Sequence, residues 1–209
     1  MRVISGSARG MTLYSVKGAE TRPTSDFVKE NLFNIIRDDV RDAVFLDLFA
    51  GTGAIGIEAL SRGASQVFFA DISQKSIDVI RRNLNKARLS EQGRAVVMKD
   101  DAVRTIKKLA EQGQKRRFDI IYADPPYFDG LATRVLDGIA EHGILADDGC
   151  VVIEMSKTHV LPKARGLQML RIKEYSSTRL VFFGTSADKA AEEHTALEEI
   201  NGSSISREL

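Results

Sequence analysis

The sequence predicts an α/β fold built on a doubly wound, Rossmann-like sheet. The sheet is expected to be mostly parallel, with an antiparallel hairpin at its carboxyl end and a small β/α extension at its amino end. Between residues 43 and 154, short apolar runs alternate with amphipathic stretches of helical period, which is typical of repeated β–α units. A glycine-rich turn follows the first run, and an acidic residue lies at the end of each of the first four. Because parallel strands end at one edge of a sheet, ligand-binding groups should gather there.

The predicted elements follow one another in a regular order. Residues 1–24 show little helical periodicity and predict an irregular, partly extended segment, after which residues 24–26 can cap a helix. The apolar stripe of that helix consists of Phe27, Val28, Leu32, Phe33, Ile35 and Ile36. Strands are then expected at 43–48, 66–71, 95–99, 118–123 and 150–154, and helices near 54–61, 74–89, 102–112 and 131–142. Two last strands, about 168–174 and 179–184, form the hairpin.

The chain divides into three expected parts. Residues 1–40 form the extension, a hairpin followed by a helix, and residues 41–184 form the main domain. Residues 185–209 contain six acidic and two basic residues and are expected to be frayed or disordered. The whole chain carries a net charge of +1, so residues 1–184 carry about +5. Solvated helix faces explain most of the basic clusters, but one cluster lies outside any helical pattern, at Arg2, Arg9, Lys17 and Arg22.

The composition narrows the class of protein. Hydrophobic residues make up 43% and charged residues 28% of the 209 residues, as in one globular domain that can bury a core. No apolar run approaches the roughly 20 residues of a membrane span, and the first residues lack the apolar region of a secretion signal. The single cysteine, Cys150, fits a cytoplasmic protein without internal disulfides. Since the three histidines show no metal-ligand spacing, no metal site is expected. The lack of a long apolar run likewise predicts no membrane partner.

The tetrapeptide Asp124-Pro125-Pro126-Tyr127 follows an apolar run that predicts a buried strand. Two prolines lack N–H donors and fix φ, so they end the strand and hold a stiff turn at the ligand edge. Asp124 and the carbonyl of Pro125 can accept the two N–H bonds of a nucleobase amine, while Tyr127 stacks on the base. This arrangement suits methyl transfer to the amine and makes these four residues the candidate catalytic group. An ordinary strand-ending turn is the alternative.

The glycine-rich turn and two further acids predict a cofactor site. Gly51 and Gly53 let backbone N–H groups approach a ligand, with Asp47 and Phe49 just before them. Asp71 ends the second strand, where it can accept hydrogen bonds from a ribose, and Asp101 follows the third, where it can take an adenine amine. Their neighbours Ile72 and Ala102 complete the candidate cofactor contacts. Each acid alone could instead be a helix cap.

Two cofactors compete for this pattern. Residues 51–56 match G-x-G-x-x-G, and Asp71 lies 20 residues after Gly51, as in NAD-binding chains. However, the charge of Asp47 suits a ligand amine better than a pyrophosphate, and only a hairpin, not a second mononucleotide-binding half, follows residue 150. The sequence therefore favours S-adenosylmethionine (SAM).

Taken together, the glycine-rich turn and Asp124-Pro125-Pro126-Tyr127 resemble the class I methyltransferases that modify nucleobase amines. Residues 2–6, 9–10, 21–24 and 28–35 resemble the bacterial 16S rRNA guanine-N2 methyltransferase family, and the resemblance runs from residue 2 to about 184. It implies methyl transfer from SAM to a guanine N2 amine of 16S rRNA, within an assembled or assembling small ribosomal subunit. In that family the amino-terminal segment helps to form the cofactor and RNA site, which implies substrate-binding roles for Arg9 and Arg22 beside Tyr127.

The resemblance has departures and rivals. Phe27 stands where the family usually carries a basic residue, and Ser176 where it usually carries a glycine. Arg22 could also be a plain surface residue near a proline turn. A DNA adenine-N6 or cytosine-N4 methyltransferase would use the same strand-end residues, but no stretch here is long enough for the usual target-recognition insertion. A non-catalytic RNA-binding assembly factor is the third possibility.

Overall fold

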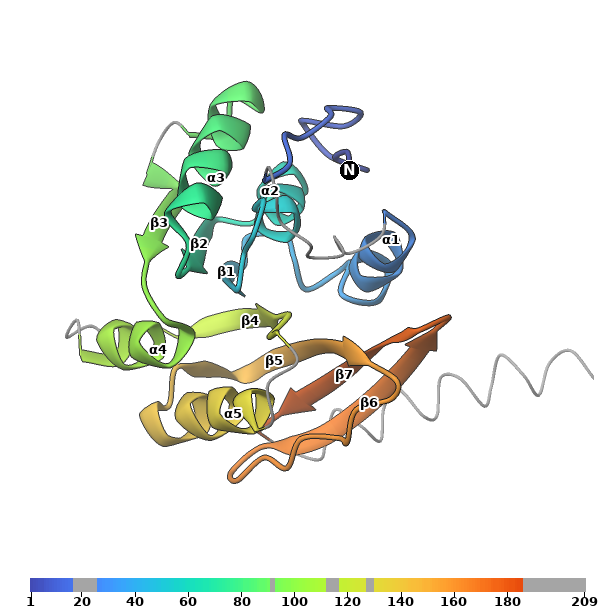
Figure 1. Cartoon of the computed structure of the whole chain (residues 1–209), viewed down its shortest axis with the longest axis vertical. Helices are drawn as coiled ribbons and strands as arrows, with labels where there is room; N and C mark the ends of the chain where they lie inside the picture. Colours follow the sequence, from blue (N-terminus) through green and yellow to red (C-terminus); the bar gives the residue numbers. More distant parts are fainter. Residues whose placement is uncertain (17–25, 91–92, 112–116, 127–129, 186–209) are drawn as a thin grey trace, which may run out of the picture.

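The structure, a computed structural model, describes residues 1–16, 26–90, 93–111, 117–126 and 130–185. Within them, seven strands form one sheet in the order β3-β2-β1-β4-β5-β7-β6 (Figure 1). The first five strands are parallel, whereas β7 runs antiparallel to both of its neighbours. The strands are β1 (Val44–Leu48), β2 (Gln66–Asp71), β3 (Ala95–Lys99), β4 (Phe118–Ala123), β5 (Leu145–Ser156), β6 (Gln168–Tyr175) and β7 (Thr178–Gly184).

Helices cover both faces of this sheet. On one face lie α1 (Asp26–Ile35), α2 (Ala54–Ser61) and α3 (Gln74–Lys86), and on the other α4 (Ala102–Glu111) and α5 (Leu131–His142). Successive side chains of a strand point to opposite faces, so Phe45 of β1 joins the first core and Leu46 joins the second. Because both faces are buried, the central strands are apolar almost throughout, as the sequence showed.

Most predicted boundaries agree with the structure. The predicted bounds of β2, β3, β4, α2 and α5 are confirmed. Strand β5 is longer than predicted because it begins at Leu145, before a shift in its pairing with β4 between Phe118 and Ile120. Helix α3 ends earlier than predicted, shortly before Arg88, whose φ of 55° is left-handed. The assignment of Phe27 to the buried stripe of α1 is wrong, since 61% of this residue is exposed.

The amino-terminal segment folds back on itself and docks on α2. An antiparallel bridge joins Arg2 to Thr12, and the amides of Ile4 and Ser5 donate to the Glu58 carboxylate at 2.7 and 2.9 Å. The Lys29 ammonium lies 3.6 Å from the same carboxylate, and both side chains are fully buried. Burial lowers the pKa of Lys29, although the charge of Glu58 opposes this effect. This buried pair fixes the segment to α1 and α2.

Some predicted features cannot be compared with the structure. Arg22, Tyr127 and residues 186–209, most of the acidic tail, lie outside the described residues. Within the described part of the chain, no helix is both long and apolar enough to cross a membrane.

Candidate active site

Four of the predicted ligand-binding acids come together at one edge of the sheet. Strands β3, β2, β1 and β4 are adjacent and parallel, so their carboxyl ends lie side by side. Asp47 is the last but one residue of β1, Asp71 ends β2, Asp101 follows β3 and Asp124 follows β4 directly. This edge is where open α/β sheets bind ligands.

The glycine-rich turn has the backbone that its sequence predicts. Phe49, Gly51 and Gly53 have left-handed φ values of 62°, 55° and 76°. Gly56, the third glycine of the motif, packs against β2 so closely that a Cβ atom would lie 2.2 Å from the Phe69 ring. The Asp47 carboxylate accepts a hydrogen bond from the Gly56 amide at 2.9 Å and thereby braces the start of α2.

Asp71 and Asp101 both hold backbone amides. Asp71 accepts from the amides of Gly51 and Ser73, each at 2.8 Å, so it ties the glycine-rich turn to the start of α3. Asp101 accepts from the amides of Val103 and Arg104 at 3.0 and 3.2 Å and thus caps α4. The helix-cap alternative is therefore realised at Asp101, and the ribose and adenine contacts stay predictions.

The residues after these two acids differ in exposure. Ile72 is 67% exposed beside the glycine-rich turn, so its side chain offers an apolar surface at the ligand edge. Ala102, the first residue of α4, is buried in the core. Of the two predicted contacts, Ile72 is the more accessible to a purine ring.

Asp124 is partly buried beside two other acids, Glu154 and Asp47. Burial is the main cause that raises its pKa to about 8, followed by the charge of Glu154 and then that of Asp47. Asp47 is itself buried, and its pKa rises to about 7, chiefly through burial and to a smaller degree through Asp71, against the opposing Gly56 hydrogen bond. Pro125 is buried and Pro126 exposed, so the turn is anchored on one side and open on the other.

Sequence reasoning missed Glu154, which lies on β5 next to Asp124. Ala123 pairs with Ile153, and the buried Glu154 accepts a hydrogen bond from the hydroxyl of Tyr122 on β4. The signal was present, because an acid in the apolar run of a central strand needs a partner or a function.

A second missed residue is Asn83 on α3, which is completely buried. Its side-chain oxygen accepts from the Tyr14 amide at 2.7 Å. Its side-chain nitrogen donates to the carbonyls of Tyr14 and Thr52 at 3.1 and 2.9 Å. Asn83 therefore joins the amino-terminal segment to the glycine-rich turn. A polar residue on the apolar face of an amphipathic helix was the available signal.

Arg9 lies away from this edge. The turn that carries it rests on the carboxyl end of α2, where the amides of Ser7 and Ala8 donate to Ser61 at 2.9 Å each. Helix α2 starts at the glycine-rich turn and runs back towards the opposite edge of the sheet, so Arg9 and Asp124 are not brought together. An RNA contact by Arg9 stays a prediction.

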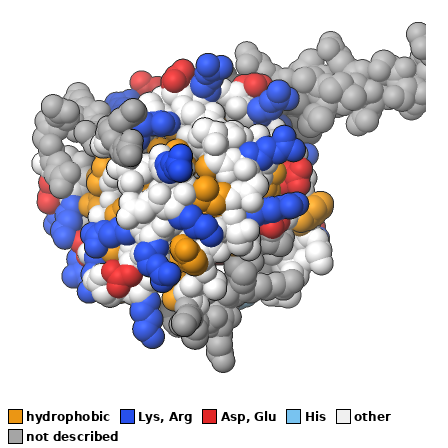
Figure 2. Space-filling view, turned by 90° about the horizontal axis from the view of Figure 1, so that it is seen from above, with side chains coloured by type: hydrophobic (Ala, Val, Ile, Leu, Met, Phe, Trp, Pro, Cys, Tyr) orange, Lys and Arg blue, Asp and Glu red, His pale blue; other side chains and the backbone are white. Residues whose placement is uncertain are grey.

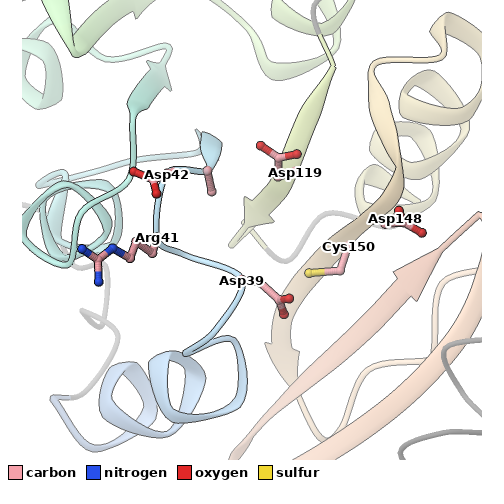
Figure 3. Close-up of a pocket in the computed structure, with 7 residues that line it drawn as sticks. Asp39, Arg41, Asp42, Asp119, Asp148 and Cys150 are labelled. Atoms are coloured by element: carbon pink, nitrogen blue, oxygen red, sulfur yellow. The ribbon is translucent and has the colours of Figure 1, made fainter.

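A hollow of about 310 Å³ lies at the opposite edge of the sheet, near the amino end of β4 (Figure 3). Asp42, Asp119, Asp148 and Cys150 are among the residues that line it. Asp119 already accepts from the Val44 amide at 2.8 Å. Among the described residues, no group of three or more acids, histidines or cysteines is arranged to hold a metal ion. The strand-end acids are therefore the better candidate site.

A family model described as "Conserved hypothetical protein 95" matches residues 1–184. The chain belongs to this family. The Bacillus subtilis relative "Putative rRNA methyltransferase YlbH" is 39% identical over 184 residues, which are 88% of this chain and 98% of that protein. The Escherichia coli K12 relative "Ribosomal RNA small subunit methyltransferase D" is 33% identical over 162 residues, which are 78% of each chain.

Solved structures share the fold of this family member. "Putative methyltransferase yhhF" from Escherichia coli is similar at a TM-score of 0.76 and 28% identity, covering 90% of this chain and 98% of that one. At lower identity, the fold also occurs in structures described as SAM-dependent methyltransferases. The predicted fold class and the resemblance to rRNA methyltransferases are both confirmed.

Proposed function

We propose that this protein transfers a methyl group from SAM to the exocyclic N2 amine of a guanine in 16S rRNA. The observation that carries the proposal is the position of Asp124. It directly follows β4, is held by two prolines, and lies at the same sheet edge as the glycine-rich turn. The names of the rRNA methyltransferase relatives support the reaction class and the RNA substrate.

The edge also fits the methyl donor. The left-handed glycines open the turn at residues 51–56, Asp71 already accepts N–H donors there, and the exposed Ile72 can cover a purine ring. When bound, SAM supplies an electrophilic methyl group on a sulfonium. Asp71 would hold the ribose hydroxyls and Asp101 the adenine amine.

The chain's own residues then orient the amine. The target guanine leaves its stack, which takes a few kcal/mol, and its N2 amine donates to Asp124 and to the carbonyl of Pro125. These bonds favour a pyramidal nitrogen whose lone pair points at the methyl group. As the N–C bond forms, the S–C bond breaks, and the cationic amine then loses a proton to Asp124 or to water. Orientation of this kind can supply up to about 7–11 kcal/mol.

The surface charge supports a nucleic-acid substrate. The end of the molecule that carries the top of α3 and the amino-terminal segment displays more Lys and Arg than Asp and Glu side chains (Figure 2). There Arg82 and Lys86 flank the Tyr14 ring at 4.5 and 4.4 Å from its centroid. Since residues 1–184 carry only about +5, we expect an assembled or assembling small subunit, rather than bare RNA, as the preferred substrate.

The test is transfer of radiolabelled methyl from SAM to unmodified small ribosomal subunits, free 16S rRNA and duplex DNA in parallel, followed by digestion to nucleosides. We expect N2-methylguanosine from the ribosomal substrate. Label in adenine or cytosine of DNA would show that the substrate is DNA, while the assignment of the active site would stand. An absence of label from all three substrates would refute the proposal.

A further inference from the structure

We infer that Phe27 and alternate residues of the edge strand β6 bind single-stranded rRNA next to the target guanine. We refer to Phe27, Tyr175, Lys173 and Arg171 as the β6 strip. The inference deepens the proposed function and rests on it, because it names the surface that would hold the RNA on one side of the target base.

The pairing of β6 with β7 places three of these residues on one face of the sheet. Arg171 pairs with Phe182, and Lys173 pairs with Leu180. Residues directly opposite in an antiparallel pair share a face, and Leu180 and Phe182 belong to the core that α1 covers. Arg171, Lys173 and Tyr175 therefore face the side of the sheet that carries α1.

Phe27 extends this strip from the first turn of α1. Its ring meets the Tyr175 ring edge to face, with centroids 5.8 Å apart and an interplanar angle of 87°. In Figure 1, α1 lies beside the ends of β6 and β7. Phe27 is nevertheless 61% exposed, so the contact holds the ring in place and leaves surface on which a base can stack. Proteins bind unstacked RNA bases on aromatic side chains of this kind.

The strip begins at the same sheet edge as Asp124. Tyr175 pairs with Thr178 of β7, and Thr178 pairs with Ser156 near the end of β5, which lies next to β4. Three interstrand spacings, or about 14 Å, therefore separate Tyr175 from Asp124 across the sheet, and Tyr175 lies about two residues, or about 7 Å, beyond Asp124 along the strands. From Tyr175 to Arg171 the strip runs about 13 Å down the face. A strand of RNA with its target base at Asp124 can thus place a neighbouring base on Phe27 and its phosphates near Lys173 and Arg171.

The charge of the strip suits phosphate. Lys173 and Arg171 are cations, and Arg171 is close enough to Tyr175 to oppose the rise that burial causes in the pKa of that phenol. The acid of this stretch, Glu174, pairs with Arg179 and so points to the other face, where it lies 3.2 Å from Lys157. The two cations of the strip therefore share their face with aromatic rings rather than with that carboxylate.

The first test is equilibrium binding of the full chain to unmodified 16S rRNA at several salt concentrations. Lys173→Ala and Arg171→Ala should each weaken binding and reduce the slope of log K against log salt by about 1. The matched control is Lys107→Ala on α4, an exposed lysine on the opposite side of the sheet, which should leave the slope unchanged. Equal effects of Lys173→Ala and Lys107→Ala would overturn the inference.

The second test addresses stacking. Phe27→Ala should raise KM for 16S rRNA by about 5- to 100-fold, because one stacked base is lost, while kcat at saturating RNA changes little. Phe27→Tyr keeps a ring and should restore KM, whereas Phe27→Leu keeps apolar bulk without a ring on which a base can stack and should not. A wild-type KM for Phe27→Ala would refute the proposal that the β6 strip binds RNA. If the wild-type protein itself methylates no RNA, the proposed function fails instead.

Discussion

The buried acids around Asp124 predict a specific pH dependence. As a carboxylate, Asp124 is the stronger N–H acceptor and can take the proton that the amine loses, and its pKa is raised to about 8. We therefore expect kcat/KM for RNA to rise with pH and to level off above about 8, because kcat/KM reports groups of the free enzyme. Replacing its neighbour by Glu154→Gln removes one cause of the raised pKa while keeping an acceptor for the Tyr122 hydroxyl. The rise should then occur at lower pH.

The size of this displacement follows from the structure. Burial is the larger cause of the rise in the pKa of Asp124 from 3.8 to about 8, so Glu154 accounts for less than half of it, or about two pH units at most. We expect the midpoint for Glu154→Gln to lie about one to two pH units below that of the wild type.

The assay is the initial rate of methyl transfer at subsaturating RNA, measured across the neutral and mildly alkaline range. Glu174→Gln is the matched control, because this half-exposed acid on β6 pairs with Lys157 away from the site, and it should leave the profile unchanged. A midpoint unaffected by Glu154→Gln, or a wild-type midpoint at the ordinary pKa of an aspartate, would refute the role of Asp124 as a raised-pKa acceptor.

Three further predictions concern the supporting residues. Asp71→Ala should weaken SAM binding in calorimetry, and unchanged affinity would remove it from the ribose site. Asn83→Ala loses three hydrogen bonds and should reduce stability by about 3 kcal/mol as well as SAM affinity, whereas Asn85→Ala on the exposed side of α3 should do neither. Asp47 has a folded pKa of about 7 against 3.8, so its ionisation makes stability fall as pH rises between these values. Asp47→Asn should abolish this loss, which amounts to up to about 4 kcal/mol in the free energy of unfolding at pH 8, as measured by urea titration. Urea unfolding curves that are the same at pH 5 and pH 8 for both the wild type and the variant would contradict this prediction.

The parts of the site that the sequence predicted are those that local chemistry determines. Proline fixes φ and glycine permits a positive φ wherever they stand, so the turns after β1 and β4 could be placed from the sequence alone. Glu154 and Asn83 could not be assigned partners in this way. Their roles depend on β5 pairing with β4 and on residues 52 and 14 meeting at α3.

The error at Phe27 has a related cause. Helical periodicity assigned this residue to the apolar side of α1, but the first turn of that helix extends past the core. Its neighbour there is Tyr175, which is distant in sequence and lies on an edge strand. The exposure of Phe27 therefore depends on how segments that are distant in the sequence pack together.

The central claim is that Asp124 orients the amine, and Asp124→Ala tests it most directly. The measurement is single-turnover methyl transfer to unmodified small subunits together with calorimetric SAM affinity, with Asp148→Ala at the opposite sheet edge as the control. We predict a rate at least about 100-fold lower for Asp124→Ala, SAM affinity close to that of the wild type, and no change for Asp148→Ala. A wild-type rate for Asp124→Ala would contradict the account.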